Sequence, residues 1–390
     1  MSTIIHGSVA PGFEPVFAAF ESAFADKPDM GGALAIRHHG RTVVDLWGGV
    51  ADERTREPWT DDTLSVIFSC TKGLVSILAA RLVQEGRLDY DARVTDYWPE
   101  FGAAGKADVR VKHLLSHRSG VSAPRVPLSA ADVLDWNVVV TELAAQEPLW
   151  HPGSGYAYHA LTHGWLAGEV IRRITGRSVG QYFADVITGP LHADSWIGLP
   201  PALDDRVAHL QAGPSLSQLT RQLAEARTPG QIDWSDEAMT LGGAFTAELI
   251  TETGGFNSPA IRAAEIPGAG GIATARSLAT IWSAAIVETD GVRLLDDAII
   301  AEATRVQSEG PPVWPVPGPW PRWGMGFQLD SEARRYLGPT GFGHDGAGGQ
   351  CAFADPHYGV GFAFLTNQME AIEDFRATRV IDALRDALDA

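Results

Sequence analysis

Strand-like segments lie near both ends of the chain, and helical patterns fill the residues between them. Residues 31–52 have the pattern of two strands around a turn at His38-His39-Gly40, and residues 341–368 that of an antiparallel hairpin around Asp355-Pro356. Apolar residues at helical spacing precede the first pair at residues 11–26, and another helical pattern follows the second. This order favours an α/β fold in which both termini build one sheet.

The sequence FSCTKGLVS, at residues 68–76, marks the point where an extended segment becomes an apolar helix. Ser69 and Lys72 are three residues apart, so they share a helical face and the lysine amine can reach the serine hydroxyl. A cation in the first turn gains nothing from the helix dipole, so Lys72 needs another reason to be there. Ser69 is therefore either a nucleophile or only the serine that begins the helix.

The composition narrows the classes of partner and compartment. The 390 residues are 45% hydrophobic and carry a formal net charge of −18, without a run of Lys or Arg, which argues against nucleic acids or anionic membranes as partners. The two cysteines, Cys70 and Cys351, are too few for a disulfide framework and indicate a reducing compartment. No secretory signal or span-length apolar stretch is visible, so we expect a cytoplasmic protein.

Two further motifs can carry chemistry. Tyr158 follows a Pro152-Gly153 turn and precedes a helical run, where it is either a catalytic group or a core tyrosine, and Tyr156 competes for any role. The glycine-rich sequence GHDGAGG, at residues 343–349, approaches a strand. Such glycines indicate close approach of the backbone to a substrate or to a neighbouring strand. A phosphate cradle is disfavoured, because the Walker lysine and Ser/Thr are missing.

Two motifs are more easily explained by structure than by catalysis. Residues 176–180 fit Gly-x-Ser-x-Gly, but that elbow requires a strand before its serine, and here a helical pattern ends at Gly176. We therefore expect Ser178 to cap the next helix. His159 and His163 are four residues apart, yet no zincin glutamate or cysteine pair accompanies them, so we expect no metal.

A Pro/Trp-rich passage, PPVWPVPGPWPRWGMGF, occupies residues 311–327. It cannot form a central strand, because its prolines remove backbone donors. Long loops of this kind are more often functional than structural. We expect Trp314, Trp320 and Trp323 to supply apolar surface near a substrate pocket.

The order of these motifs resembles that of the serine β-lactamase and penicillin-binding fold: Ser69-x-x-Lys72, then Tyr158 after a Pro-Gly turn, then a glycine-rich strand. The sequences VKHLLSHRSGV (residues 111–121), PGSGYAYHALTHGWLAGEVIRRITGRSVGQYF and FGHDGAGGQCAFADP look closest to one branch. That branch is the family VIII carboxylesterases, the class C β-lactamase-like esterases of bacteria. The resemblance spans residues 10–388.

The resemblance implies a single catalytic domain over residues 1–390. An α/β lobe, an antiparallel sheet flanked by helices, would comprise residues 1–90 and 255–390, and a mainly helical lobe residues 91–254. The active site would lie between the two lobes, and no cofactor or metal would be required.

The resemblance also implies roles for single residues. Ser69 matches the nucleophile, Lys72 the lysine that hydrogen-bonds it, and Tyr158 the tyrosine that shares the proton transfer. The oxyanion hole would consist of the backbone N–H groups of Ser69 and Ala347. The residues expected to bind substrate are His344 and Gly346 on the glycine-rich strand, and Trp320 and Trp323 on the Pro/Trp-rich passage.

Either Lys72 or Tyr158 can serve as the base that activates Ser69. An unperturbed lysine, with a pKa near 10.4, is charged at neutral pH and cannot accept a proton. Burial at the start of the helix is expected to lower the pKa of Lys72, and a neighbouring ammonium is expected to lower the pKa of Tyr158. The sequence leaves both alternatives open.

Two departures from the β-lactamase pattern bear on the substrate. Ala160 stands where those enzymes place an amide-holding asparagine, and His344-Asp345-Gly346 replaces Lys-Thr-Gly, whose lysine attracts the substrate carboxylate. Both changes disfavour an anionic amide substrate and favour a neutral ester.

We therefore expect a serine carboxylesterase that hydrolyses neutral esters of small or medium acyl groups through an acyl-enzyme on Ser69. One alternative is hydrolysis of β-lactams or D-amino-acid peptides or amides, or acyl transfer, by the same fold. An alternative from another class is a scaffold without catalysis that binds a ligand or partner. The presence of Ser69, Lys72 and Tyr158 together argues against the scaffold.

Overall fold

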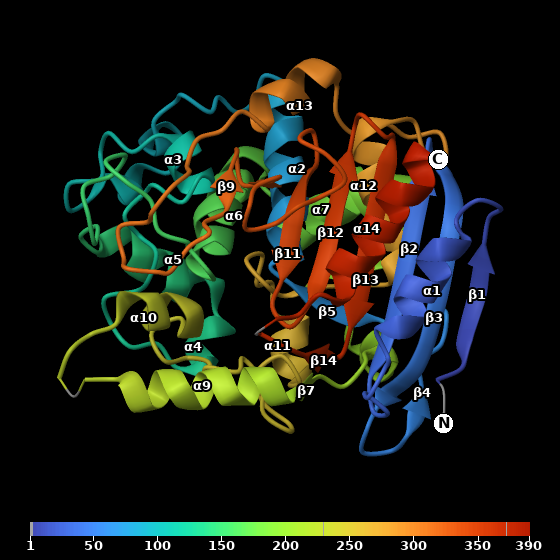
Figure 1. The fold of residues 1–390 in the computed structure, drawn as a ribbon. Coiled ribbons are helices and arrows are strands. Elements are labelled where there is room, and N and C mark those ends of the chain that lie inside the picture. Colours follow the sequence, from blue (N-terminus) through green and yellow to red (C-terminus); the bar gives the residue numbers. More distant parts are fainter. Residues whose placement is uncertain (1–2, 229, 372) are drawn as a thin grey trace.

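The computed structural model describes residues 3–228, 230–371 and 373–390, and its main sheet joins both ends of the chain (Figure 1). At the centre, β2 (Gly31–His38) and β13 (Val360–Thr366) run antiparallel with Leu34 opposite Phe364. The strand order in the described residues is β1 (Ile5–Val9), β3 (Arg41–Asp52), β2, β13, β12 (Gln350–Asp355), β11 (Phe342–Gly346), β10 (Gln328–Leu329) and β9 (Arg322–Trp323), with β4 (Glu57–Pro58) beside β3. All neighbouring pairs are antiparallel, so the predicted fold class is confirmed.

Helices cover both faces of this sheet. α1 (Glu14–Ser22) and α14 (Arg376–Asp389) lie side by side over one face (Figure 1). α12 (Ala275–Ile286) packs on β2, β12 and β13 from the other face, and α2 (Cys70–Gln84) packs on β11 and β12. The sheet is therefore the middle layer of a three-layer arrangement.

The sequence of β2 explains how one strand serves both layers. Leu34 and Ile36 belong to the core with α1 and α14, whereas the smaller Ala33 and Ala35 belong to the core with α2 and α12. A strand buried on both faces is a nearly continuous apolar run, as GGALAI is here.

The middle of the chain is mostly helical and lies beside α2 (Figure 1). Its α-helices are α3 (Val111–Leu115), α4 (Ala130–Val133), α5 (Trp136–Ala145), α6 (Thr162–Thr175), α7 (Val179–Phe183), α8 (Gly189–Leu191), α9 (Pro214–Ala226) and α10 (Trp234–Thr240). Shorter helical turns are η1 (Val94–Asp96), η2 (Pro99–Gly102), the π-helix η3 (Ala184–Thr188) and η4 (Pro201–Arg206). α11 (Pro259–Ala263) and α13 (Asp297–Ala303) follow nearer the C-terminal end.

Two small sheets tie the helical segment to the rest of the molecule. β6 (Ser195–Ile197) pairs with β8 (Gly271–Ala273), which also pairs with β5 (Ser65–Phe68). β7 (Gln211–Ala212) runs parallel to β14 (Gln368–Met369). None of the helices in the described residues is long and apolar enough to cross a membrane.

The Pro/Trp-rich passage has the predicted irregular character. Residues 311–321 form no strand or helix, and the two residues of β9 lie at the outer edge of the main sheet. The expectation that this passage cannot be a central strand is therefore confirmed.

Candidate active site

Ser69 lies at a sharp turn between β5 and α2. The preceding Phe68 has a φ of +44°, in the left-handed region that bulky residues rarely adopt. Ser69 is the N-cap of α2, but its side chain forms no capping hydrogen bond. The Ser69 hydroxyl is therefore free for another role than starting the helix.

Lys72 points its amine at Ser69 from the first turn of α2. Its Nζ lies 2.9 Å from Ser69 Oγ, 2.6 Å from the carbonyl oxygen of Ala160 and 2.7 Å from that of Gly268. The side chain is completely buried, and this burial lowers the pKa of Lys72 well below its usual value, as the sequence led us to expect. A neutral amine has two N–H groups for the two carbonyls and a lone pair for the Ser69 hydroxyl, which is the arrangement of a general base.

Tyr158 approaches Ser69 from the segment before α6. Its hydroxyl donates a hydrogen bond to Ser69 Oγ at 2.9 Å, and Lys72 Nζ lies 4.9 Å from the centre of its ring. Burial raises the pKa of Tyr158, so the expected lowering was wrong. That expectation assumed a charged Lys72, whereas burial disfavours the charged form of both groups.

His117 holds the backbone on both sides of Tyr158. The N–H of Ala157 donates to the His117 carbonyl at 3.1 Å, and the N–H of His159 donates to His117 Nδ1 at 3.2 Å. Trp323 stacks on the Tyr158 ring, with centroids 5.3 Å apart and planes 16° from parallel. The sequence analysis assigned no role to His117, although the motif LLSHRSG contains it.

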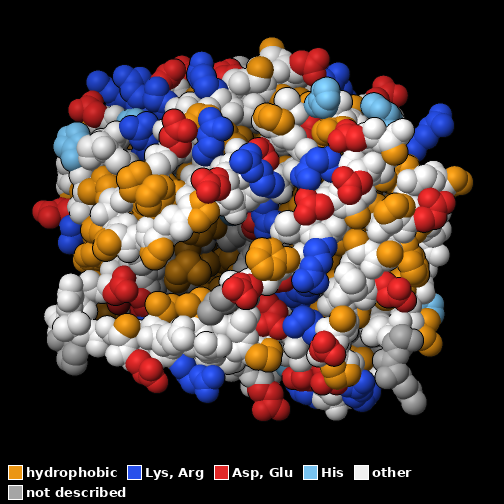
Figure 2. All heavy atoms as spheres, in the orientation of Figure 1, with side chains coloured by type: hydrophobic (Ala, Val, Ile, Leu, Met, Phe, Trp, Pro, Cys, Tyr) orange, Lys and Arg blue, Asp and Glu red, His pale blue; other side chains and the backbone are white. Residues whose placement is uncertain are grey.

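One cavity, which we call the aromatic cavity, opens beside Ser69 and has a volume of about 510 Å³. A hollow lined with hydrophobic side chains is visible between the helical segment and β11 (Figure 2). The lining residues are mainly aromatic and aliphatic: Ser69, Tyr156, Ala157, Tyr158, Ser235, Ala238, Met239, Pro312, Trp314, Val316, Trp320, Pro321, Trp323, Gln328, His344, Asp345, Gly346 and Ala347. All the predicted substrate-binding residues lie in this wall.

His344 brings an uncharged ring to the aromatic cavity. Burial lowers the pKa of His344 to about 3, so the ring is neutral at physiological pH. Its Nδ1 pairs with the carbonyl oxygen of Asp345 at 2.6 Å, and Nε2 has no partner in the described residues. The wall therefore has a neutral ring where the Lys-Thr-Gly pattern has a cation, and its unpartnered nitrogen is buried.

Gly346 is required by the close packing of two strands. A Cβ atom at this position would lie 2.3 Å from the carbonyl oxygen of Ile67. β11 and β5 are therefore too close together for any side chain at this position. This contact brings Ala347 next to the turn that carries Ser69, in the same cavity wall.

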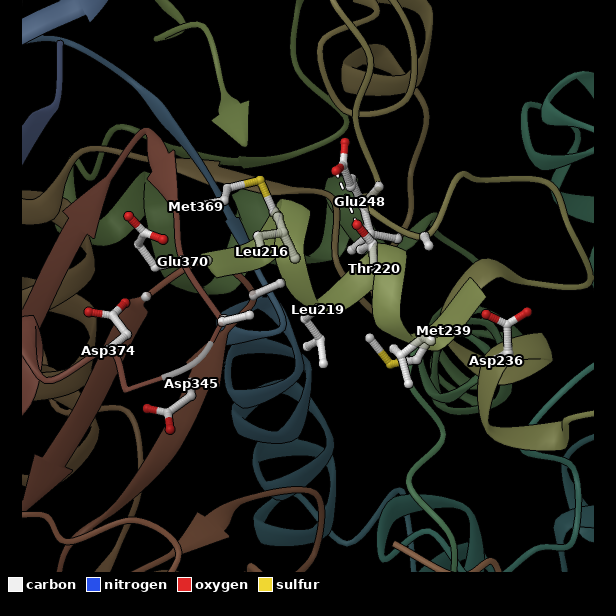
Figure 3. Close-up of a pocket in the computed structure, with 18 of the residues that line it drawn as sticks. Leu216, Leu219, Thr220, Asp236, Met239, Glu248, Asp345, Met369, Glu370 and Asp374 are labelled. Carbon is white, nitrogen blue, oxygen red and sulfur yellow. Dashed lines mark hydrogen bonds between the residues drawn. The ribbon is translucent and has the colours of Figure 1, made fainter. Parts of the chain in front are cut away.

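A second cavity, which we call the α9 cavity, has a volume of about 470 Å³ (Figure 3). Ala347 belongs to its wall as well. Its wall consists mainly of α9, α10, residues 247–249, residues 345–350 and the segment around β14, together with Arg334. The two cavities share Ser235, Met239, Asp345, Gly346 and Ala347. No sequence pattern had indicated the α9 cavity.

The motifs interpreted as structural have structural roles. Ser178 caps α7 and accepts the N–H of Gln181, and the preceding element is the helix α6, so the elbow is excluded here. His159 pairs with Ser119 Oγ at 2.8 Å and His163 with the carbonyl of Leu115 at 3.3 Å. The described residues contain no group of three side chains suited to a metal ion.

Comparison with known proteins agrees with this geometry. A profile of the beta-lactamase family matches residues 18–387. The chain is 35% identical over 377 residues to the esterase/beta-lactamase LipL of Mycobacterium tuberculosis, covering 94% of this chain and 83% of LipL. The crystal structure of a family VIII carboxylesterase has a TM-score of 0.84 and 37% identity, covering 98% of this chain and 100% of the other. A penicillin-binding protein homolog from Caulobacter crescentus has a TM-score of 0.85 and 38% identity, with the same coverage.

Proposed function

The chain belongs to the beta-lactamase family, and on this premise we propose that it is a serine carboxylesterase that hydrolyses neutral esters of small or medium acyl groups. The observation that carries the proposal is the position of Ser69 Oγ, 2.9 Å from both Lys72 Nζ and the Tyr158 hydroxyl, in the wall of an apolar cavity. A nucleophile, a base and a proton donor are thus within reach of one ester carbonyl.

The reaction begins when the neutral Lys72 amine takes the proton from Ser69 Oγ and the oxygen attacks the ester carbonyl carbon. The N–H groups of Ser69 and Ala347 stabilise the negative charge that develops on the carbonyl oxygen. As the carbon–oxygen bond to the alcohol breaks, Tyr158 gives its proton to the leaving oxygen and regains one from the Lys72 ammonium. Water then attacks the acyl-enzyme by the same proton transfers, which releases the acid and restores Ser69.

The preference for neutral esters rests on two neighbouring residues. Ala160 has no amide side chain to hold a substrate amide, and its carbonyl already accepts the Lys72 amine. His344 is neutral and cannot attract a carboxylate as a lysine would. Binding of an uncharged ester therefore does not depend on either missing group, whereas a β-lactam carboxylate lacks the cation that usually pairs with it.

Hydrolysis of β-lactams is the second candidate, because the name of LipL, a relative at 35% identity, includes both activities. We expect kcat/KM for p-nitrophenyl butyrate to exceed that for a chromogenic cephalosporin under the same conditions. A faster cephalosporin would place the protein with the β-lactamases.

A phosphonate ester should add its mass to the peptide that contains Ser69, and labelling of the peptide that contains Ser178 would refute the proposed nucleophile.

A further inference from the structure

The two cavities adjoin at Ala347, a residue of both walls and one of the two expected oxyanion-hole residues. We propose that the α9 cavity binds the acyl chain of the substrate, as a flexible apolar chain, and that the aromatic cavity binds the alcohol. This assignment rests on the proposed esterase function and extends it to both halves of the substrate.

The position of Tyr158 sets the direction of the substrate. The leaving oxygen must receive a proton, and a proton donor has to lie within hydrogen-bond reach of it. Tyr158 and Ser69 line the aromatic cavity and are absent from the wall of the α9 cavity. The alcohol therefore leaves through the aromatic cavity, and the acyl chain extends past Ala347 in the other direction.

The walls of the two cavities differ in shape and stiffness. The aromatic cavity presents flat rings, among them Trp314, Trp320 and Trp323. The α9 cavity presents flexible aliphatic and thioether groups, contributed by Leu216, Leu219, Leu223, Met239, Leu249 and Met369. Figure 3 shows Leu219 and Met239 pointing toward each other across this space. Methionine and leucine side chains adapt to a flexible chain, whereas stacked rings suit a flat group.

The helix α9 itself has the pattern expected of a substrate wall. It spans 13 residues, its apolar and polar residues lie on different faces, and none of them is buried. An amphipathic helix normally buries its apolar face against the core. Here Leu216, Leu219 and Leu223 line the α9 cavity, and of these three Leu216 also packs against the core, so an apolar chain in the cavity would complete the contact for Leu219 and Leu223.

Carboxylates around the α9 cavity are already occupied by protein partners. Asp345 pairs with Arg334 at 2.5 Å, Asp374 with Arg376 at 2.6 Å, and Glu370 with Lys27 at 2.8 Å. Glu248 accepts a hydrogen bond from Thr220 at 3.2 Å (Figure 3). Each of these acids therefore has a protein partner, and the two arginines of the wall, Arg227 and Arg334, pair with Asp236 and Asp345, so neither is left without a carboxylate to attract a negatively charged acyl chain. The free surface of the cavity is therefore suited to an acyl chain without charge.

The test fills each cavity separately and measures selectivity as ratios of kcat/KM. Leu219→Trp narrows the α9 cavity, and Val316→Trp, in the loop, narrows the aromatic cavity as the matched control. Acyl selectivity is kcat/KM for p-nitrophenyl octanoate divided by kcat/KM for p-nitrophenyl acetate. Alcohol selectivity is kcat/KM for benzyl butyrate divided by kcat/KM for ethyl butyrate. Both reactions are monitored by pH titration of the released acid.

We expect Leu219→Trp to lower the acyl ratio by at least about tenfold, since each methylene kept out of apolar contact loses about fourfold in binding. The alcohol ratio of this variant should change by less than about twofold, and Val316→Trp should show the opposite pattern. Leu223→Trp is a second blocking variant in case Leu219→Trp fails to fold, because Leu223 is 53% exposed and tolerates a larger side chain. Thermal melting and phosphonate labelling of Ser69 report whether each variant is intact.

An exchanged pattern, in which Leu219→Trp or Leu223→Trp lowers only the alcohol ratio, would overturn the assignment of the two cavities. Unchanged ratios in folded, labelled variants would show that the α9 cavity binds no part of the ester. Wild-type protein that turns over none of these esters would refute the proposed function, and the assignment with it. This outcome can be distinguished from failure of the cavity assignment alone, because the two selectivity ratios could not then be measured for any variant.

Discussion

At Lys72, two backbone carbonyls and one hydroxyl oxygen surround the amine within 2.9 Å. A charged ammonium could donate to all three, but burial disfavours that charge. A neutral amine satisfies both carbonyls and keeps its lone pair for Ser69. The geometry is thus compatible with either protonation state, and burial favours the one that can act as a base.

The pH dependence of turnover should therefore report the lowered pKa of Lys72. The amine loses its base function when protonated, so kcat/KM should fall as pH decreases through that pKa and stay constant above it. Because burial lowers this pKa well below 10.5, the plateau should begin far below that value. Lys72→Arg, which keeps a permanent charge, should lose about 10²–10⁴-fold in kcat. A pH–rate profile that rises only near pH 10 would contradict this protonation state.

Tyr158→Phe should also reduce turnover by about 10²–10⁴-fold, because the hydroxyl that donates to Ser69 Oγ is lost. The ring keeps its contacts with Trp323 and His117, so the thermal stability should change little. Combined with Lys72→Ala, the loss should be much smaller than the product of the two single losses, since the groups act as one unit. Steady-state kinetics of the single and double variants measures this, and full multiplicativity would indicate independent action.

At the scale of elements, the contact between β13 and α12 brings two backbones together at Gly361. A Cβ atom there would lie 2.4 Å from the Ser283 nitrogen and 2.5 Å from the Ala279 carbonyl oxygen. Neither atom belongs to a movable side chain, so the helix or the strand must shift if a methyl group is added. The central strand of the sheet thus depends on a residue without a side chain.

We expect Gly361→Ala to lower the free energy of unfolding by about 1–3 kcal/mol. Gly338→Ala is the matched control, because its added Cβ would meet the Tyr358 ring at 3.5 Å and Asp355 Oδ2 at 3.6 Å, which are ordinary contacts. The control should change the free energy of unfolding by less than about 0.5 kcal/mol. Urea unfolding of both variants gives the comparison, and equal effects would contradict the role assigned to the β13–α12 contact.

At the scale of the whole molecule, the order of motifs along the chain predicted that its two ends form one sheet. Hydrophobic patterns at the two ends predicted one sheet from both termini, because strand and hairpin patterns are local signals. Ser69-x-x-Lys72 and the residues before α6 were recognisable for the same reason. The N-cap role of Ser178 also followed from the adjacent helical pattern.

Other features depend on contacts between distant segments, and no local pattern reports these. His117, Tyr158 and Trp323 come from three separate parts of the chain, yet Trp323 stacks on Tyr158 and the His117 ring lies edge-to-face with both. The α9 cavity requires α9, residues 345–350 and β14 to come together. The sign of the Tyr158 pKa shift was missed for a related reason: the depth of burial at Lys72 and Tyr158 is a property of the folded molecule.

The pairing of β2 with β13 has a consequence for the biosynthesis of this protein. Gly32 lies opposite Thr366, so the ribosome must add 366 − 32 = 334 further residues before this ladder can close. Until then, β2 has an open edge along residues 31–38, where N–H and C=O groups are free to pair with strands of other chains. Contacts of such long range also form slowly. A chain still on the ribosome therefore lacks the strand that covers this edge of β2, and one of the last strands to be synthesised protects one of the first.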